Sequence, residues 1–519
     1  MGITIAAFFP TLLNNVKMIK HFTNILTLVC LVLVLSCNQQ GSQLVNENTK
    51  EFNEAYRPQF HFSPPSQWMN DPNGMVYLDG EYHLFYQYYP DSTIWGPMHW
   101  GHAISEDMVH WEHMPVALFP DEFGYIFSGS AVVDHNNTSG LGTSENPAMV
   151  AIYTYHDPEG EKAKRDDYQT QGIAYSTDRG RTWTKHENNP ILKNPGIKDF
   201  RDPKVSWVES NDGTGQWIMA LAVLDRISFY SSPNLIDWAH ESDFNPSWGA
   251  YGGVWECPDL FPLTTADGEV KWVLFVSINP GGPNGGSATQ YFIGDFDGSN
   301  FNVESNEVKW LDYGADNYAG VTWSNIPKAD GRKLMIGWMS NWLYANVVPT
   351  ENWRSAMTVP RSLELIKKGN DFLVASKPIK ELEKLRSSTE TVKGENIALR
   401  EELVELELIP KANDFSIEFS NAANEKVLIS KKGDVLTFDR SQSGKMDFSG
   451  DFGKIHQAPI ANEKIQSIRI FLDRSSLEIF VNGGELVLTE ILFPNSPYNK
   501  VTLIGFENES KLHYLKSIW

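Results

Sequence analysis

The strongest constraint on the fold is a long series of short apolar or alternating runs, which fills the chain from Tyr56 to about Ile366. Runs such as Tyr82 to Tyr88 and Trp272 to Ile278 are bounded by residues that are typical of turns. Apolar residues at helical spacing are nearly absent from this region. Because strands repeat every two residues and helices every 3.6, the pattern indicates an all-β fold.

A degenerate repeat organises these runs into units. Three segments, residues 105–111, 176–183 and 231–238, each place a small polar turn ahead of a tryptophan. They recur at intervals of roughly 55 to 70 residues, close to the length of a four-stranded propeller blade with long loops. About 310 residues at this interval give around five blades. We therefore predict a five-bladed β-propeller over residues 56–366.

Three acids in this region, Asp71, Asp202 and Glu256, each stand next to or near a proline. Turn residues of this kind fix the backbone and so fix the direction of the neighbouring side chain. The innermost strands of successive blades line one axis, so acids that are far apart in sequence can point into one cavity. We predict one shared pocket, although an Asp-Pro pair by itself is also a common turn.

The stretches around these acids resemble the signatures of a known enzyme family. They read Trp68-Met69-Asn70-Asp71-Pro72-Asn73-Gly74, Phe200-Arg201-Asp202-Pro203-Lys204 and Trp255-Glu256-Cys257-Pro258-Asp259-Leu260. Further motifs follow in the family's order: Tyr82-His83-Leu84-Phe85-Tyr86-Gln87-Tyr88, Trp95-Gly96-Pro97-Met98-His99-Trp100-Gly101-His102, Phe127-Ser128-Gly129-Ser130 and Asp473-Arg474-Ser475-Ser476-Leu477-Glu478-Ile479-Phe480. Together they resemble glycoside hydrolase family 32, the family of levanases, inulinases and invertases. The resemblance implies a five-bladed propeller with its active site in a funnel at one end of the channel.

The resemblance also implies a retaining hydrolase that releases fructose from β-D-fructofuranosides. It assigns Asp71 as the nucleophile, Glu256 as the general acid/base and Asp202 as the stabiliser of the transition state. Retaining enzymes hold their two carboxyl groups about 5–5.5 Å apart. Because one carboxylate raises the proton affinity of its neighbour, we expect Glu256 to be protonated while hydrogen bonds keep Asp71 ionised.

Other positions match the sugar-binding residues of the family, since amides and hydroxyls pair with sugar hydroxyls and aromatic rings form an apolar floor. They are Asn70, Gln87, Trp95, Phe127, Ser128, Arg201 and Trp338. Without the resemblance, Phe127 and Trp338 would be interpreted as core residues. His99 and His102 have no carboxylate or cysteine that would complete a ligand set, so we predict no metal and no cofactor.

Several functional alternatives stay open at this stage. We favour an exo-acting levanase or fructanase, but an endo-levanase or a fructosyltransferase would use the same residues, and a surface glycan-binding lipoprotein could share the leader and the aromatic residues. The preference between levan, inulin and sucrose also stays open. A formal net charge of −22 argues against nucleic acid or an anionic membrane surface as partner.

The amino-terminal residues resemble a bacterial lipoprotein leader. Basic residues precede the apolar run from Ile25 to Leu35, and Val34-Leu35-Ser36-Cys37 resembles a lipobox. We predict a signal peptide over 1–37, with Met18 as an alternative start, and lipidation of Cys37 in the cell envelope. Polar residues 38–55 would tether the folded protein to the lipid.

The second half of the chain predicts a further domain. Residues 379–386 are charged and compatible with a helix, so we interpret the surrounding segment 367–388 as a connector. Alternating strands return over 389–519 and indicate a hairpin-rich β-sandwich. We assign this domain no catalytic residue, and we expect its acid Glu478 to face solvent or to pair with Arg474.

Overall fold

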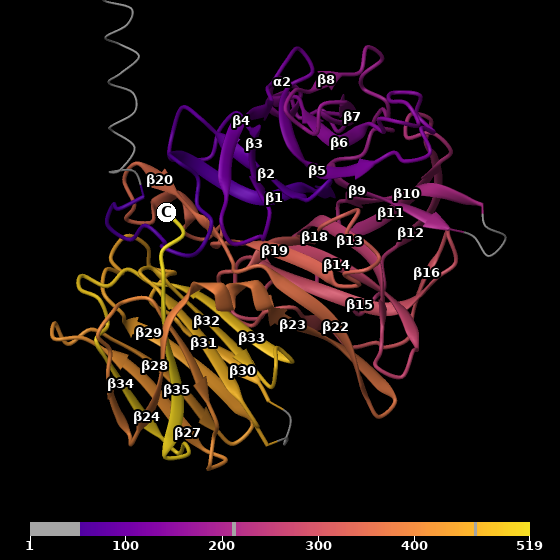
Figure 1. Cartoon of the computed structure of the whole chain (residues 1–519). Helices are drawn as coiled ribbons and strands as arrows, with labels where there is room; N and C mark the ends of the chain where they lie inside the picture. Colours follow the sequence, from indigo (N-terminus) through magenta and orange to yellow (C-terminus); the bar gives the residue numbers. More distant parts are fainter. Residues whose placement is uncertain (1–51, 210–213, 461–463) are drawn as a thin grey trace, which may run out of the picture. The chain divides into compact units, whose positions relative to one another are not determined.

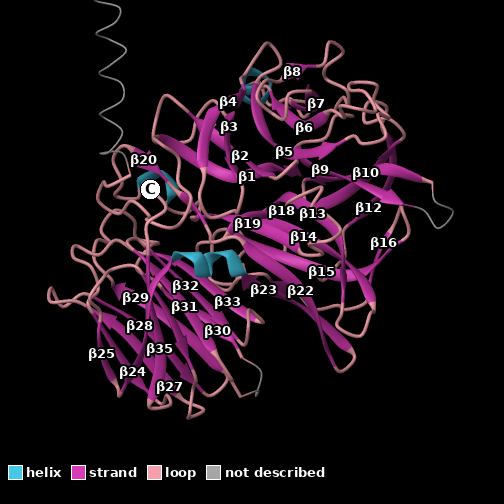
Figure 2. Ribbon diagram, viewed as in Figure 1, coloured by secondary structure: helices cyan, strands magenta, loops and turns pink. Residues whose placement is uncertain are grey.

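The structure is a computed structural model that describes residues 52–209, 214–460 and 464–519. Strands account for most of these residues (Figures 1 and 2). The helical elements in the described ranges are α2 (Pro158–Lys162) and the 3-10 helices η1 (Ala345–Val347) and η2 (Lys380–Leu385). Within the same ranges, no helix has the length and apolar character needed to cross a bilayer. The predicted leader and most of the predicted tether lie outside the described residues.

Five sheets follow one another along the first part of the chain. The first contains β1 (Gln67–Leu78), β2 (Glu81–Tyr89), β3 (His99–Ser105) and β4 (Glu112–Leu118), with β20 (Trp353–Arg354) beside β1. The second contains β5 (Tyr125–Val133), β6 (Met149–His156), β7 (Gln169–Ser176) and β8 (Thr184–Lys185). The third contains β9 (Phe200–Glu209), β10 (Gly215–Val223), β11 (Arg226–Ser232) and β12 (Ala239–Phe244). The fourth contains β13 (Val254–Thr264), β14 (Val270–Asn279), β15 (Ala288–Phe296), β16 (Phe301–Val303) and β17 (Lys309–Trp310). The fifth contains β18 (Tyr318–Thr322), β19 (Lys333–Met339), β21 (Ala356–Met357), β22 (Arg361–Lys368) and β23 (Asp371–Pro378).

The first strands of these sheets form a closed cycle. β1 contacts β5, β5 contacts β9, β9 contacts β13, β13 contacts β18, and β18 contacts β1. A late segment of this region also returns to its beginning, because β20 pairs in parallel with β1 through Gln67 opposite Trp353. The predicted all-β fold, a propeller followed by a sandwich, is confirmed. Such a cycle is what a five-membered ring requires, and the number of blades stays a prediction.

Two six-stranded sheets form the sandwich. One contains β24 (Arg386–Lys393), β26 (Val404–Leu408), β31 (Ile468–Asp473), β32 (Ser476–Val481), β33 (Leu486–Ile491) and β35 (Glu509–Leu515). The other contains β25 (Asn396–Ala398), β27 (Phe415–Ser420), β28 (Lys426–Lys432), β29 (Val435–Gln442), β30 (Ile455–Pro459) and β34 (Lys500–Ile504). Alternate residues of both sheets, such as Leu406 and Ile417, are fully buried in one cluster, as expected for a sandwich core.

The boundary between the two domains differs from the prediction. β22 and β23 belong to the fifth sheet, which therefore continues beyond residue 366 and takes in part of the predicted connector, 367–388. Lys367 and Lys368, which lie inside the predicted connector, end one strand of a hairpin whose turn contains Gly369 at φ +64°. The connecting segment that remains is η2, directly before β24.

A buried ionic network joins the propeller to the sandwich. The His61 ring lies between two carboxylates, with 2.8 Å from Nδ1 to Asp473 and 2.8 Å from Nε2 to Glu478. Glu478 also accepts from Arg361 on β22. The expectation that Glu478 faces solvent or pairs with Arg474 is therefore wrong: Arg474 donates to Glu402 instead. Glu478 is fully buried because a cation from the propeller meets it there.

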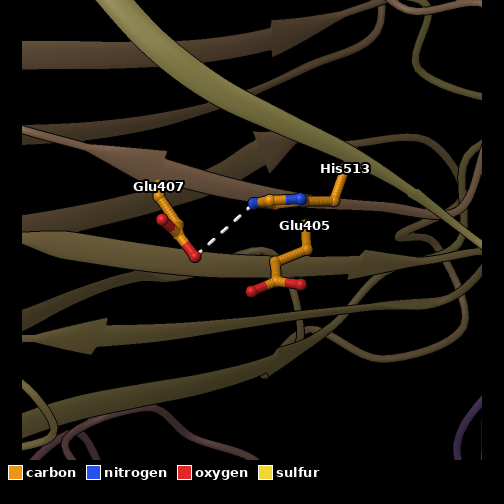
Figure 3. A group of neighbouring side chains, drawn as sticks. All are labelled: Glu405, Glu407 and His513. Atoms are coloured by element: carbon orange, nitrogen blue, oxygen red, sulfur yellow. Dashed lines mark ion pairs between the residues drawn. The ribbon is translucent and has the colours of Figure 1, made fainter. Parts of the chain in front are cut away.

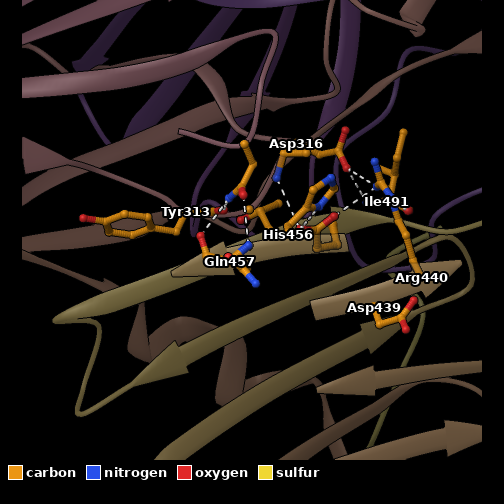
Figure 4. A network of polar contacts seen from close by, with 12 residues as sticks. Tyr313, Asp316, Asp439, Arg440, His456, Gln457 and Ile491 are labelled. Carbon is orange, nitrogen blue, oxygen red and sulfur yellow. Dashed lines mark hydrogen bonds and ion pairs between the residues drawn. The ribbon is translucent and has the colours of Figure 1, made fainter. Parts of the chain in front are cut away.

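A second network crosses the same junction (Figure 4). Arg440 on β29 is fully buried and donates to Asp316, which lies just before β18, over 2.7 Å. The Arg440 guanidinium also lies 3.0 Å from the Glu490 carboxylate. A 2.8 Å hydrogen bond joins this carboxylate to His456 Nδ1. Removing one partner of such a buried pair leaves an uncompensated charge, so these contacts fix how the two domains meet.

We expect His61→Gln to destabilise the protein in a pH-dependent way. Burial lowers the pKa of His61, but hydrogen bonds to Asp473 and Glu478 outweigh it and raise the pKa to about 9. A group with a raised pKa in the folded state contributes its full stability below the pKa of the unfolded state, which is about 6.5 for histidine. This contribution is lost as pH rises through about 9. The apparent melting temperature of the variant should therefore lie about 3–6 °C below wild type at pH 6.

The control for this prediction is His110→Gln, which removes an imidazole that is 55% exposed and paired with one carboxylate, Asp107. Its melting temperature should stay within about 1 °C of wild type, since exposed ion pairs contribute little. Scanning calorimetry at pH 6, 7.5 and 9 measures both variants. A deficit of His61→Gln that is constant with pH, or that grows toward pH 9, would show that the imidazole is not a cation here.

Candidate active site

The three predicted acids lie near the beginning of the first strands of three sheets. Asp71 is on β1, Asp202 on β9 and Glu256 on β13. At each of these positions the strand pairing is interrupted by a register shift. A bulge adds a residue on one side and turns the neighbouring side chains out of the normal alternation, so that they can point into a central cavity.

The same irregularity occurs on the two remaining first strands. β5 shifts register between Ile126 and Gly129, and β18 shifts between Tyr318 and Val321. Asp202 has a positive φ of 63°, which is uncommon for a residue other than glycine. The prolines next to the acids are the sequence signal for this geometry, because proline inside a strand is confined to edges and bulges.

Residues at the bulges of β1, β5, β9 and β13 line a pocket of about 240 Å³. Its lining includes Asp71, Asp202 and Glu256, so the structure brings the three acids together. Six of the seven predicted sugar-binding residues line it as well: Asn70, Gln87, Trp95, Phe127, Ser128 and Arg201. The remaining lining residues were not predicted: His156, Glu161, Tyr168, Gln169, Asp199 and Trp342.

Trp338, the seventh predicted sugar-binding residue, is fully buried and lies behind the pocket wall. Its ring centroid is 4.9 Å from that of Trp342 and 6.3 Å from that of Tyr318. Trp342 also stacks on Trp68 at 5.8 Å. The aromatic surface that reaches the pocket is thus Trp342, and Trp338 supports it from behind.

The Asp71 carboxylate is fixed by three donors. Asn70 Nδ2 donates to Oδ1 over 3.1 Å, while Ser128 Oγ and Cys257 Sγ donate to Oδ2 over 2.9 and 3.4 Å. Burial raises the pKa of Asp71 and the negative charge of Glu256 raises it further, whereas the three hydrogen bonds act in the opposite direction. The donors hold one orientation of the carboxylate and partly offset its burial.

Asp202 lies close to Asp71. The Cys257 backbone N–H donates to Asp202 Oδ2 over 3.0 Å, and the Cys257 thiol lies 3.4 Å from Asp71 and 3.6 Å from Asp202. Burial raises the pKa of Asp202 to about 7, with Glu256 and Asp71 acting in the same direction and Arg201 opposing them. Near neutral pH the free pocket therefore retains at least part of a proton on its carboxyl groups.

Glu256 accepts from a cation and a phenol. Arg201 Nη2 donates to its Oε1 over 2.9 Å, and the Tyr318 hydroxyl donates to Oε2 through a short hydrogen bond. Arg201 also donates to Asp199 over 2.6 Å and lies 4.0 Å from Asp202. The arginine is thus shared among three carboxylates. Tyr318 is buried and carries no sequence signal that would have identified it.

Two buried donors near the pocket have no hydrogen-bond partner within the described residues. They are Nε2 of Gln87 and Nε1 of Trp338. Buried polar groups are nearly always paired in folded proteins, so an unpaired donor at a pocket indicates that a ligand provides its partner. Because Gln87 lines the pocket, its amide can meet a hydroxyl of a bound molecule.

The histidines considered for metal binding are engaged elsewhere. His102 is buried, and its Nε2 lies 3.0 Å from His83 Nδ1. His99 makes a 2.9 Å hydrogen bond to the Pro97 carbonyl. Neither residue lines the pocket, so both lie apart from the acids.

A different group, Glu405, Glu407 and His513 in the sandwich, has ligand atoms close enough together for a cation (Figure 3). However, both carboxylate oxygens of Glu405 accept from arginines, Arg386 and Arg469. These cations already compensate the buried charge and would repel a metal ion. The group is therefore interpreted as an ion-pair network.

Comparisons with known proteins cover nearly the whole described chain. Residues 61–376 match the Glycosyl hydrolases family 32 N-terminal domain, and residues 375–519 match the Glycosyl hydrolases family 32 C terminal. The levanase of Bacillus subtilis (strain 168) is 45% identical over 96% of this chain and 76% of its own length. The extracellular exo-inulinase of Aspergillus niger is 37% identical over 90% of this chain and 96% of its own length. The crystal structure of exo-inulinase from Aspergillus awamori superposes with a TM-score of 0.81 at 36% identity, over 90% of this chain and 100% of that one.

Proposed function

This chain belongs to glycosyl hydrolase family 32, and we propose that it is a retaining β-fructosidase that removes terminal fructose from fructans. One observation carries the proposal: Asp71, Asp202 and Glu256, from three separate sheets, line a single pocket of about 240 Å³. A fructosyl unit is uncharged and rich in hydroxyls, which suits a pocket of acids, amides and aromatic rings.

In the first step, Asp71 attacks the anomeric carbon while the bond from that carbon to the leaving oxygen breaks. Glu256 gives its proton to the leaving oxygen, and a covalent fructosyl intermediate remains on Asp71. In the second step, Glu256 takes a proton from water, and the water oxygen displaces Asp71. Two displacements at the same carbon retain its configuration.

Asp202 accepts hydrogen bonds from the fructosyl hydroxyls, which strengthen as positive charge develops on the ring. Arg201 holds Glu256 and Asp199 in place and lies 4.0 Å from Asp202. The hydrogen bonds on Asp71 prepare its carboxylate for attack, because they hold it in one orientation before substrate arrives.

The size of the pocket favours attack at chain ends. A volume of about 240 Å³ lies below the ~300–1,000 Å³ that is typical of pockets for drug-sized ligands, and it suits a single monosaccharide unit. The named relatives include a levanase and exo-inulinases. We therefore favour an exo-acting fructanase over an endo-levanase or a fructosyltransferase.

Product analysis tests this proposal. We expect incubation with levan, inulin and sucrose to release free fructose from the earliest time points, because one terminal unit is removed in each cycle. Chromatography of timed samples measures the products. Early accumulation of fructo-oligosaccharides would indicate endo action, lengthened chains would indicate transfer, and the absence of any product would contradict a fructosidase.

We also propose that the protein is exported and anchored by lipid at Cys37. The lipobox at the end of a short apolar run supports the anchor, and a relative named as extracellular supports export. We expect Cys37→Ala either to leave the precursor unprocessed or to move the protein out of the detergent phase in Triton X-114 partition. Cys30→Ala, which leaves the lipobox unchanged, is the matched control. Normal incorporation of labelled palmitate into Cys37→Ala would exclude the anchor.

A further inference from the structure

Exposed apolar side chains gather on the loops around the catalytic pocket. Of the ten large apolar side chains that are exposed in the described residues, six lie on three segments between strands that also carry or contact the pocket wall. They are Ile94, Trp95, Phe119, Phe123, Leu343 and Val347. All three exposed aromatic residues are among them, and concentrated exposure of this kind marks a binding surface.

Two of these aromatic residues border a separate groove. Phe119 is 56% exposed and Phe123 38% exposed, and both lie on the loop between β4 and β5. They line a hollow of about 500 Å³ whose opposite wall includes Trp183 and Lys185. We call this hollow the Phe119–Phe123 groove. His186, Glu187 and Asn189 also line it and provide nitrogen and oxygen atoms for hydroxyl groups.

The loop that carries the two rings is held in a fixed conformation. Asp121 and Gly124 exchange backbone hydrogen bonds of 3.1 and 3.2 Å, which makes a tight turn with Phe123 inside it. The Asp121 carboxylate then accepts from Lys185 over 2.5 Å and from the Tyr155 hydroxyl over 2.8 Å. Phe123 lies within this turn, and the carbonyl of Phe119, two residues before the turn, accepts from Lys185. Aromatic rings on a backbone anchored in this way are presented without a large loss of conformational entropy on binding.

The groove and the catalytic pocket share a wall. A Cβ on Gly124 would lie 2.0 Å from the carbonyl oxygen of His156, so the turn rests directly on this residue. The His156 ring lines the catalytic pocket and stacks on Phe127 at 4.2 Å. Its neighbour Tyr155 lines the groove. Successive residues of a strand face opposite sides, and Tyr155 and His156 of β6 accordingly line the groove and the catalytic pocket, respectively.

The catalytic pocket accommodates one fructosyl unit, so the rest of a polymeric substrate must lie over the surrounding surface. We propose that the Phe119–Phe123 groove is a second fructan-binding site, in which furanose rings and linking CH₂ groups pack on the two phenylalanine rings. This inference rests on the proposed function and names polymeric fructan as the substrate that benefits. Carbohydrate C–H groups pack on aromatic faces as other apolar groups do, while the hydroxyls stay at the polar edge.

The test compares a polymer with a disaccharide. In the double variant Phe119→Ala/Phe123→Ala, we expect KM for high-mass levan to rise about tenfold, since two aromatic contacts are lost, while kcat on levan is unchanged. Both kcat and KM for sucrose should stay within about twofold, because sucrose offers only one sugar ring beyond the fructosyl unit. Retardation of the protein in native gels that contain levan should also be lost.

The matched control is Ile455→Ala/Ile504→Ala, which removes two side chains on the sandwich that are 53% and 55% exposed. It should leave KM for levan unchanged. The conservative double variant Phe119→Tyr/Phe123→Tyr keeps both rings and should retain the wild-type KM. An unchanged KM for levan in the alanine variant, or an equal loss of kcat/KM on levan and sucrose, would overturn the proposal that the groove binds fructan. Either result would leave the fructosidase proposal intact. If wild type hydrolyses no fructoside, the proposed function fails, and gel retardation still decides whether the groove binds levan.

Discussion

Asp71→Asn should reduce hydrolysis of every fructoside by about 10⁴-fold or more, because no covalent intermediate can form without the carboxylate. The quality of the leaving group should not matter, since the missing step is the attack on the anomeric carbon. Asparagine preserves the shape of the side chain and leaves Ser128 and Asn70 in place around it. Initial rates on levan, sucrose and an aryl fructofuranoside measure the loss.

The same variant should be at least as stable as wild type. Burial and Glu256 raise the pKa of Asp71, so ionising this carboxyl costs the folded state free energy that the unfolded state does not lose. The wild-type protein is therefore most stable at low pH, where Asp71 is protonated, and it loses this stability as pH rises through the raised pKa. A neutral asparagine avoids that loss, and the melting temperature of the variant should equal or exceed wild type at pH 8.

Asp91→Asn provides the matched control, because it removes an exposed carboxylate on the loop between β2 and β3. Its activity on all three substrates should stay within about twofold of wild type. Activity of Asp71→Asn within tenfold of wild type, or inactivity that accompanies a lower melting temperature at pH 8, would contradict the role assigned to Asp71.

Much of this pocket could be predicted from the sequence because its signals are local. Each acid lies next to or near a proline, which a strand tolerates at an edge or a bulge, and the tryptophan repeat gives the spacing of the sheets. These two signals bring Asp71, Asp202 and Glu256 to one place without any distance information. The sugar-binding residues beside the acids, such as Asn70 and Arg201, were assigned by the resemblance to glycoside hydrolase family 32.

The residues that were missed depend on contacts between distant parts of the chain. Tyr318 is 62 residues from Glu256 in sequence and reaches it only because β18 lies beside β13. Likewise, Glu478 becomes buried only where Arg361, 117 residues away, meets it at the junction between domains. Alternation along a strand predicts which face a residue occupies, but not which partner covers that face.

The roles of the two carboxyl groups can be separated with Glu256→Ala. The leaving group of a natural fructan is a sugar alkoxide, which needs a proton in order to depart. Hydrolysis of levan should therefore fall about 10²–10⁴-fold when the general acid is removed. The phenolate of an activated substrate, such as an aryl fructofuranoside, departs without that proton. The rate of the first step on such a substrate should fall much less. The intermediate on Asp71 should then accumulate, because no base remains to activate water, and a burst of released phenol close to one per enzyme should precede slow turnover.

Azide distinguishes this mechanism from a general loss of structure. As an anion that needs no base, it should attack the accumulated intermediate, accelerate turnover and yield a fructosyl azide of retained configuration. Glu256→Gln keeps a side chain that Arg201 and Tyr318 can contact and should show the same rescue, which separates proton transfer from positioning. Equal losses on natural and activated substrates, no effect of azide, or a first product of inverted configuration would reverse the assignment of Glu256 as the acid and base.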